Sequence, residues 1–395
     1  MTCLKKFGEY LRDNIKMKQL KIKDKYHPLI AFLGTRAVLF IAMYAGLIML
    51  NMKGNPQGWR ALPDCLFLDG WARWDSGWYR NIAEEGYKYI SGGETNVVFF
   101  PLYPLLMRAS AIIYGNSVIG GIIISNACFL AALYVIFSLV REKWGREAAI
   151  FTVYSMALFP FSFFFSAVYT ESLFLLLTAS SIFAAEKNRW GAAFILGFLS
   201  GLTRLMGMFI PVALVLIYLR KKDWDIKKAG ADVLWPVLSG TGVLAYSAYL
   251  YSRFGDPLAV FHGTAAGWQR DLSATNILHL DTISMFFRGE VHIGYYSLLI
   301  IGSLFLTLGF IALCRLVYRK MGIEYALFSL VMIAVPFISS KDLMGMGRYV
   351  SVVFPCFVVV GMLGIPRTVL LAAGAAFLAL QAGLAILFGN WYFVA

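Results

Sequence analysis

Long apolar runs separated by short polar segments dominate the pattern along the chain. The clearest runs cover residues 29–50, 118–140, 229–251, 295–313, 325–338, 350–365 and 368–387. A helix of about 20 apolar residues crosses the hydrocarbon core of a bilayer. The pattern therefore predicts an all-α polytopic membrane protein.

Clusters of Lys and Arg set the expected topology. Residues 1–28 hold eight Lys or Arg against three acids, and further clusters follow at 141–146, 187–189 and 220–222. Basic segments stay in the cytoplasm, so the chain must cross out and back between successive clusters. Two pairs of short spans then meet at outer tips, near Glu171 and near Arg204. Counted this way, about eleven helices cross the membrane, with the N-terminus inside and the C-terminus outside.

This topology predicts one membrane domain over residues 29–390. A cytoplasmic basic segment, 1–28, precedes it, and an outer tail, 391–395, follows. Two sizeable outer loops interrupt the domain, at 51–117 and 252–294. Arg36 breaks the first apolar run, and we expect its side chain to snorkel to the inner interface.

Composition narrows the possible functions. Hydrophobic residues make up 59% of the chain and charged residues 14%, with a mean hydropathy of +0.69, whereas soluble proteins have about 25% charged residues. The net charge of +13 follows the inner segments, so it does not indicate a nucleic-acid partner. The five cysteines form no CxxC motif and the four histidines no HExxH motif, so we expect no metal site. The absence of an N-x-S/T sequon favours a prokaryotic source, hence the cytoplasmic (plasma) membrane.

The first outer loop is rich in aromatic residues. Read as one helix, residues 71–82 place four side chains on one face: Trp71, Trp74, Trp78 and Ile82. Tryptophan prefers the membrane interface, so this amphipathic helix should lie flat on the outer surface with Asp75 at its border. A lipid phosphate would sit at that height. Alternatively, Asp75 only pairs with Arg73 or Arg80, or caps a helix.

Several short motifs, taken in order, resemble the PIG-V family of GPI mannosyltransferases, within the GT-C superfamily. The motifs are Trp74-Asp75 with Trp78-Tyr79, Gly86-Tyr87, Phe99-Phe100-Pro101-Leu102-Tyr103-Pro104, Phe159-Pro160, Tyr169-Thr170-Glu171-Ser172, Gly201-Leu202-Thr203-Arg204 with Gly207, and Gly347-Arg348-Tyr349 with Phe354-Pro355. They span residues 70–355. The resemblance implies a GT-C-like fold and an inverting transfer of a hexose, mannose by analogy, from a polyprenyl-phosphate sugar on the outer face.

Such a transfer needs a general base for the acceptor hydroxyl and cations for the leaving phosphate. Asp75 matches the acidic position of the family and is the expected catalytic base. Arg348 and Arg204 are the expected phosphate ligands, because a guanidinium donates two parallel hydrogen bonds. Substrate contacts are expected from six further residues: Trp74, Trp78, Tyr79, Tyr103, Tyr169 and Glu171. The acceptor is a glycolipid, a wall polymer or a protein.

Alternatives remain open for these residues. Each arginine could instead pair with a neighbouring acid, and Glu171 could orient Arg204 or lie in the first turn of a helix capped by Thr170. The chain has no DxD motif in the first outer loop, and its one DxD, at 223–225, falls in an inner loop. This favours a lipid-monophosphate donor without an obligatory metal or other cofactor. A secondary transporter or lipid flippase, or a non-catalytic scaffold, are the competing classes; a transporter predicts related halves and charges deep in the spans.

Overall fold

The computed structural model describes residues 23–53, 60–268, 270, 295–340, 343 and 345–394. The described residues are 77% helical, and no strand occurs among them. The predicted helical class is thereby confirmed. Most of the basic segment 1–28 and most of the second outer loop, including His279 and His292, lie outside the described residues.

Four helices are long and apolar enough to cross a membrane: α2 (His27–Met49), α6 (Ser117–Trp144), α16 (Tyr295–Met321) and α20 (Arg367–Gly389). They coincide with four of the predicted runs. The run predicted over 229–251 is not continuous: α11 (Leu234–Leu238) and α12 (Gly242–Phe254) meet at 63°. At this break Gly242 packs so closely on α9 that a Cβ would lie 2.0 Å from the carbonyl of Phe198.

Shorter helices fill the space between the long ones. They are α7 (Arg146–Leu158), α8 (Glu171–Glu186), α9 (Trp190–Gly201), α10 (Ile210–Lys221), α17 (Ile323–Ser339), α18 (Met346–Ser351) and α19 (Phe354–Gly361). At 1.5 Å per residue, α9 and α10 are each only about 18 Å long. By length and composition, the described part of the chain has four candidate spans, or five with the bent pair. The number of about eleven membrane-crossing helices therefore stays a prediction from the sequence.

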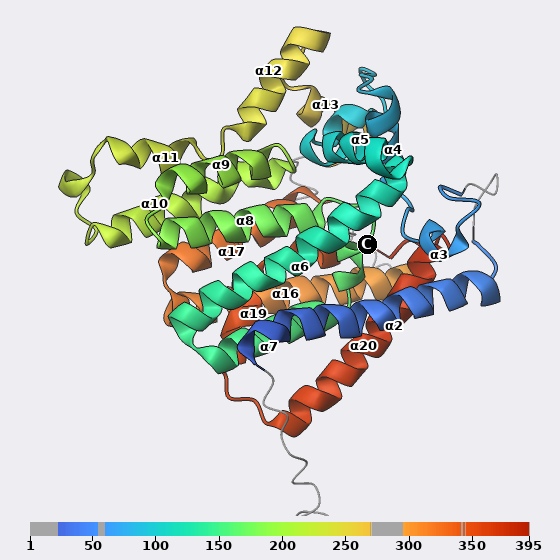
Figure 1. Ribbon diagram of the computed structural model, residues 1–395. Helices are drawn as coiled ribbons and strands as arrows, with labels where there is room; N and C mark the ends of the chain where they lie inside the picture. Colours follow the sequence, from blue (N-terminus) through green and yellow to red (C-terminus); the bar gives the residue numbers. More distant parts are fainter. Residues whose placement is uncertain are drawn as a thin grey trace, which may run out of the picture.

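The first outer loop forms α3 (Leu66–Asp69), α4 (Ser76–Glu85) and α5 (Leu102–Tyr114), and the second begins with α13 (Ala259–Trp268). In Figure 1, α4, α5 and α13 lie together at the upper right, with α3 on the same side. Short 3₁₀ turns connect the helices at Asp24–Tyr26, Asn96–Val98, Ser162–Phe165, Leu205–Phe209, Ile226–Lys228 and Ala231–Val233. Pro101 and Pro104 lie at the start of α5, where a helix tolerates proline.

The single helix predicted over 71–82 is wrong. The chain turns at Trp74, which has a φ of 53°, and α4 begins only at Ser76. Trp71 is fully buried, with its ring 4.5 Å from the ring of Phe40 on α2. The tryptophans therefore do not form one face toward lipid, because packing against α2 takes the first of them into the interior.

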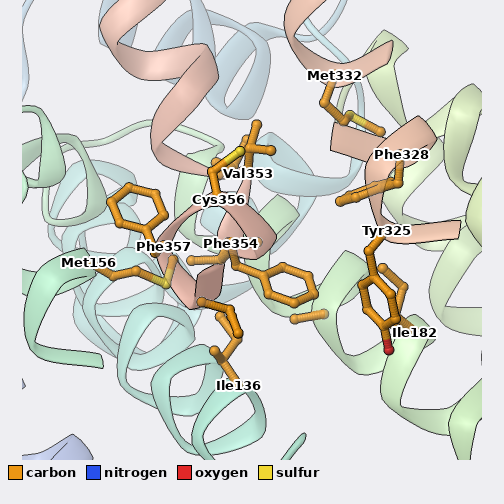
Figure 2. Packing of buried hydrophobic residues seen from close by; sticks show 14 of the residues in the cluster. Ile136, Met156, Ile182, Tyr325, Phe328, Met332, Val353, Phe354, Cys356 and Phe357 are labelled. Atoms are coloured by element: carbon orange, nitrogen blue, oxygen red, sulfur yellow. The ribbon is translucent and has the colours of Figure 1, made fainter. Parts of the chain in front are cut away.

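The largest core cluster lies where α6, α7, α8, α17 and α19 meet (Figure 2). Ile136, Met156, Ile182, Phe328 and Phe354 each have at most 1% exposure. Apolar side chains gain little by leaving lipid for protein, so close packing holds such helices together. This core gives the short helices fixed positions relative to one another.

Arg36 does not snorkel to the interface. Its side chain is buried and donates to the carbonyl of Ser162 at 3.0 Å, the hydroxyl of Ser166 at 3.1 Å and the carbonyl of Ala157 at 3.3 Å. These acceptors lie at the irregular turn after α7, where backbone carbonyls lack helical partners. Arg36 therefore ties α2 to this turn.

A second group of charges joins the far ends of the short helices. Glu186, at the end of α8, contacts Lys143 of α6 and Arg220 of α10, and Arg220 also lies 2.7 Å from Glu324 at the start of α17. These residues belong to the clusters that predict the inner face. Their mutual pairing satisfies charges that would otherwise be buried alone.

Candidate active site

The turn that carries Asp75 is fixed by a buried ion pair. Nη2 of Arg73 lies 2.6 Å from an oxygen of Asp69, and both side chains have 0% exposure. Arg73 also donates from Nε to the carbonyl of Gly389 at 2.8 Å, which ties the turn to the end of α20. The left-handed φ of Trp74 costs a residue with a Cβ about 1–2 kcal/mol. The buried pair holds the turn in this conformation.

Tyr169 fixes the backbone of Asp75 from the other side. The N–H of Asp75 donates to the Tyr169 hydroxyl at 3.3 Å, and this hydroxyl donates to the carbonyl of Arg73 at 3.2 Å. Burial raises the pKa of Tyr169 well above its ordinary value, so the hydroxyl keeps its proton. Arg80 pairs with Glu84 at 3.0 Å. Neither of the two arginines near Asp75 in sequence is therefore its partner.

The carboxylate of Asp75 pairs with Arg348, which is 273 residues away in sequence. Its Oδ2 lies 2.8 Å from Nη1 of Arg348, with the two side chains 27% and 12% exposed. The guanidinium also lies 5.1 Å from the centre of the Tyr169 ring. Burial works against the charged form, but the carboxylates of Asp75 and Glu171 outweigh it and raise the pKa of Arg348. The predicted base and the first predicted phosphate ligand are thus in direct contact.

Arg204 and Glu171 form a second pair beside the first. Nη1 of Arg204 lies 2.6 Å from Oε1 of Glu171, and Nη1 of Arg348 lies 3.9 Å from the same oxygen. Thr170 precedes α8 but makes no capping hydrogen bond through its side chain; its hydroxyl accepts from Arg204 at 3.4 Å. Glu171 is therefore placed to orient Arg204, and Arg348 stands between two carboxylates.

A third arginine joins the group through Tyr349. Nη1 of Arg270 donates to the Tyr349 hydroxyl at 3.0 Å, and the Tyr349 ring lies 5.1 Å from the guanidinium of Arg204 and 5.3 Å from that of Arg270. Burial alone would raise the pKa of Tyr349, but the surrounding arginines outweigh it and lower this pKa. Three guanidinium groups and two carboxylates thus lie close together.

Short helices bring these residues together. Glu171 begins α8, Arg204 follows α9 and Arg348 lies in α18. The ends of these helices meet beneath α4, since Tyr79 of α4 contacts Thr170 at 3.4 Å. Charged groups contributed by four separate segments thus converge at one place.

Two open grooves lie on either side of the start of α4. The larger, about 460 Å³, is lined by Trp74, Gly77, Trp78, Asn81, Lys88, Ile90, Glu94, Thr95 and Asn96. The smaller, about 320 Å³, is lined by Trp74, Gly77, Arg80, Asn81, Glu84, Glu85 and Trp391. Both grooves include Trp74 and Gly77, which flank Asp75 in the sequence. Asp75 itself is not among the residues that line either groove, but both grooves adjoin the turn that carries it.

The predicted aromatic contacts take different places. Trp78 lines the larger groove and stacks on Phe99 at 5.9 Å between ring centres. Tyr79 is 7% exposed and Tyr103 is fully buried, with the Tyr103 hydroxyl donating to the carbonyl of Gly121 at 3.0 Å. The ring of Tyr103 contacts the ring of Tyr79, with 5.4 Å between their centres. Tyr103 is not among the residues that line the two grooves.

Sequence reasoning assigned no role to Arg270, Tyr349 or Trp391. Arg270 follows the aromatic Trp268 at the edge of the second outer loop, and Trp391 begins an aromatic stretch after the last apolar run. A basic residue beside aromatics in an outer loop is a usable signal for a phosphate site. Nothing in the sequence links Trp391 to Trp74, whose ring centre lies 5.6 Å away.

Within the described residues, no group of three or more His, Cys, Asp or Glu side chains is arranged to hold a metal ion. The donor set of the site is mainly guanidinium, with two carboxylates already paired to it. That catalysis needs no obligatory metal stays a prediction from the sequence.

Comparisons with known proteins agree with this architecture. Residues 100–246 match the family described as dolichyl-phosphate-mannose-protein mannosyltransferase. GPI mannosyltransferase 2 of Cryptococcus neoformans is 30% identical over 128 residues, or 30% of this chain and 29% of the relative. GPI alpha-1,6-mannosyltransferase 2 of Homo sapiens is 29% identical over 151 residues, or 34% of this chain and 29% of the relative. Of solved structures, ArnT from Cupriavidus metallidurans bound to undecaprenyl phosphate is similar in fold, with a TM-score of 0.54 at 14% identity over 89% of this chain and 64% of ArnT.

Part of the chain is thus similar to GPI mannosyltransferases of the PIG-V type, and its fold is similar to that of ArnT. The match to each curated PIG-V relative spans less than a third of that relative's length. In this PIG-V-like chain the matched family region includes Glu171 and Arg204 but neither Asp75 nor Arg348. Within this chain, Arg348 contacts Asp75 at 2.8 Å and lies 3.9 Å from Glu171.

Proposed function

We propose that this PIG-V-like chain is an inverting mannosyltransferase. It takes mannose from a polyprenyl-phosphate sugar and transfers it to a hydroxyl of a glycolipid, wall polymer or protein. The observation that carries the proposal is the position of Arg348 between Asp75 and Glu171, beside Arg204. One site then holds both a base and a set of cations, as transfer from a lipid phosphate requires.

Asp75 acts as the general base. Its Oδ2 is held by Arg348, and its side chain is 27% exposed, so an acceptor hydroxyl can approach the carboxylate. The second oxygen, Oδ1, has no partner in the part of the chain that the structure describes. As the new glycosidic bond forms, this carboxylate takes the hydroxyl proton, while the bond between the sugar and the phosphate breaks on the opposite side of the anomeric carbon.

The arginines stabilise the leaving phosphate. A sugar phosphodiester carries one negative charge and becomes a monoester with nearly two as the bond breaks. The side chains of Arg204 and Arg348 are 13% and 12% exposed, and the buried Nε of Arg348 has no hydrogen-bond partner in the described residues. Arg348, Arg204 and Arg270 therefore match an anion whose charge grows during the reaction.

The identity of the donor rests on similarity and on charge. The similar ArnT structure holds undecaprenyl phosphate, and the matched family takes its description from dolichyl phosphate mannose. Both are polyprenyl phosphates, and both support a lipid-phosphate donor here. The proposed reaction lies on the extracytoplasmic face of a prokaryotic plasma membrane, because basic residues gather at the opposite ends of α6, α10 and α16.

The test is transfer of radiolabelled mannose from synthetic polyprenyl-phosphate mannose by the purified protein in detergent. Asp75→Asn should lower kcat about 10²- to 10⁴-fold, the range for loss of a general base. Asp232→Asn is the matched control: Asp232 accepts a hydrogen bond from Tyr218 near the far end of α10, and this variant should keep the wild-type rate.

Two outcomes would overturn the proposal. A wild-type rate in Asp75→Asn would remove this residue from the chemistry. Failure of the wild-type protein to transfer mannose, together with uptake of the intact lipid-linked sugar by sealed vesicles, would instead establish a transporter or flippase.

A further inference from the structure

The smaller groove beside α4 has an aromatic wall built from two segments that lie far apart in the sequence. Trp74 precedes α4, and Trp391 follows α20, with their ring centres 5.6 Å apart at 60°. The ring of Phe393 also meets Trp74, at 5.1 Å. The groove has a volume of about 320 Å³, within the usual range of about 300–1,000 Å³ for small-molecule sites.

The rest of this groove is polar. Arg80 and Glu84 are paired at 3.0 Å, and Glu84 accepts a hydrogen bond from Ser117 at 2.8 Å. Asn81 and Glu85 complete the lining. An amide, carboxylates and a guanidinium offer both donors and acceptors, beside indole rings that suit an apolar ring face. A pyranose combines these two requirements, because it has hydroxyl groups around its edge and C–H groups on its faces.

The groove adjoins the turn that carries Asp75, and none of Arg204, Arg270 and Arg348 lines it. Oδ2 of Asp75 is bound to Arg348, whereas Trp74 and Gly77, the residues around it, line the groove. An inverting transfer brings the acceptor hydroxyl to the base from the side opposite the leaving group. A sugar in this groove would lie beside the turn that carries the base, apart from the phosphate ligands, which do not line the groove.

We propose that the groove between α4 and Trp391 binds the saccharide head of the acceptor, and that Trp391 helps to select it. The inference rests on the proposed function, since it assigns the second substrate of the same reaction. The final residues of the chain thereby become part of the substrate site.

Gly77 offers a way to block the groove without disturbing the fold. A Cβ built at Gly77 would have no atom within 4 Å, so a larger side chain would extend into the groove. Leucine also favours helices over glycine by about 0.8–1 kcal/mol. Gly191 in α9 has the same open surroundings but lies at the end of the protein opposite the site, which makes Gly191→Leu a matched control.

The experiment measures transfer from polyprenyl-phosphate [¹⁴C]mannose to a lipid extract of membranes from a strain that lacks this protein. Gly77→Leu and Trp391→Ala should each raise the apparent KM for the extract at least tenfold, while the KM for the donor changes less than twofold. Trp391 lines only the smaller groove, so its variant separates the two grooves. Gly191→Leu should match the wild type in both constants.

An unchanged acceptor KM in Trp391→Ala would overturn the proposal, and so would an increase confined to the donor KM. These results differ from a failure of the proposed function, in which the wild-type protein itself transfers no mannose to the extract. Monodisperse elution on size exclusion, required of every variant, separates loss of binding from loss of fold.

Discussion

The pair formed by Arg204 and Glu171 allows structural and catalytic roles to be separated. Glu171 is 1% exposed and Arg204 13%, with 2.6 Å between them. Replacing Arg204 with Met leaves a buried carboxylate, and breaking a buried pair costs about 3–5 kcal/mol. Arg348 reduces this loss, because it lies 3.9 Å from the same oxygen. At an effective dielectric constant of about 20, the attraction is about 4 kcal/mol at that distance and about 6 kcal/mol for the Arg204 contact.

We therefore expect Arg204→Met to destabilise the protein by about 2–3 kcal/mol, at the lower edge of the range for broken buried pairs. Adding Glu171→Gln removes the stranded charge, and the double variant should return to within about 1 kcal/mol of the wild type, because an uncharged pair is often neutral. Transfer activity should not return. Loss of one preorganised donor to developing charge costs about 10²- to 10³-fold in kcat, and the double variant still lacks that cation.

The assays are equilibrium unfolding in mixed micelles for the four members of the cycle, and mannose transfer for the same four proteins. Additive destabilisation, with a coupling below about 0.5 kcal/mol, would refute the ion pair as the source of stability. Recovery of both stability and activity in the double variant would show that Arg204 serves the fold alone. Tryptophan fluorescence of each folded protein controls for gross rearrangement.

Two further substitutions test the frame around the site. Gly345→Ala should weaken donor binding, measured as a higher donor KM, because Gly345 has a φ of 87°, which strains a residue with a Cβ, and it immediately precedes the helix that carries Arg348. An unchanged donor KM would show that this backbone conformation does not position Arg348. Arg36→Met should lower the free energy of unfolding by about 1–3 kcal/mol, since it strands buried acceptors such as the carbonyl of Ser162; equilibrium unfolding checks this, and wild-type stability would contradict it.

Hydropathy predicted the long helices because their sequence must suit lipid along its whole length. The ends of α2, α6 and α20 lie within a few residues of the predicted runs. The break between α11 and α12 escaped this reasoning, since it depends on the close contact of Gly242 with α9. Hydropathy averages over a window and carries no information about which neighbour a glycine must meet.

The site was predicted residue by residue but not as an arrangement. Asp75, Arg348 and Arg204 were separate expectations, and the structure places them within one group of contacts. The sequence offered Arg73 and Arg80 as nearer partners for Asp75, and these are paired elsewhere. Local spacing cannot reveal a partner 273 residues away. The sequence does show which residues have the chemistry for binding phosphate or taking up a proton, wherever they stand in the chain.

Helix length explains why charges gather where they do. α9 and α10 are about 18 Å long, so their shared end falls about 12 Å short of the full hydrocarbon thickness of about 30 Å. The segment between them carries Arg204, and a lone charge at such depth costs about 2.5–3.5 kcal/mol. Pairing with Glu171 offsets that cost, and Nη1 of Arg348 lies 3.9 Å from the same carboxylate oxygen. A phosphate that approaches from the headgroup region is an anion that suits these two guanidinium groups.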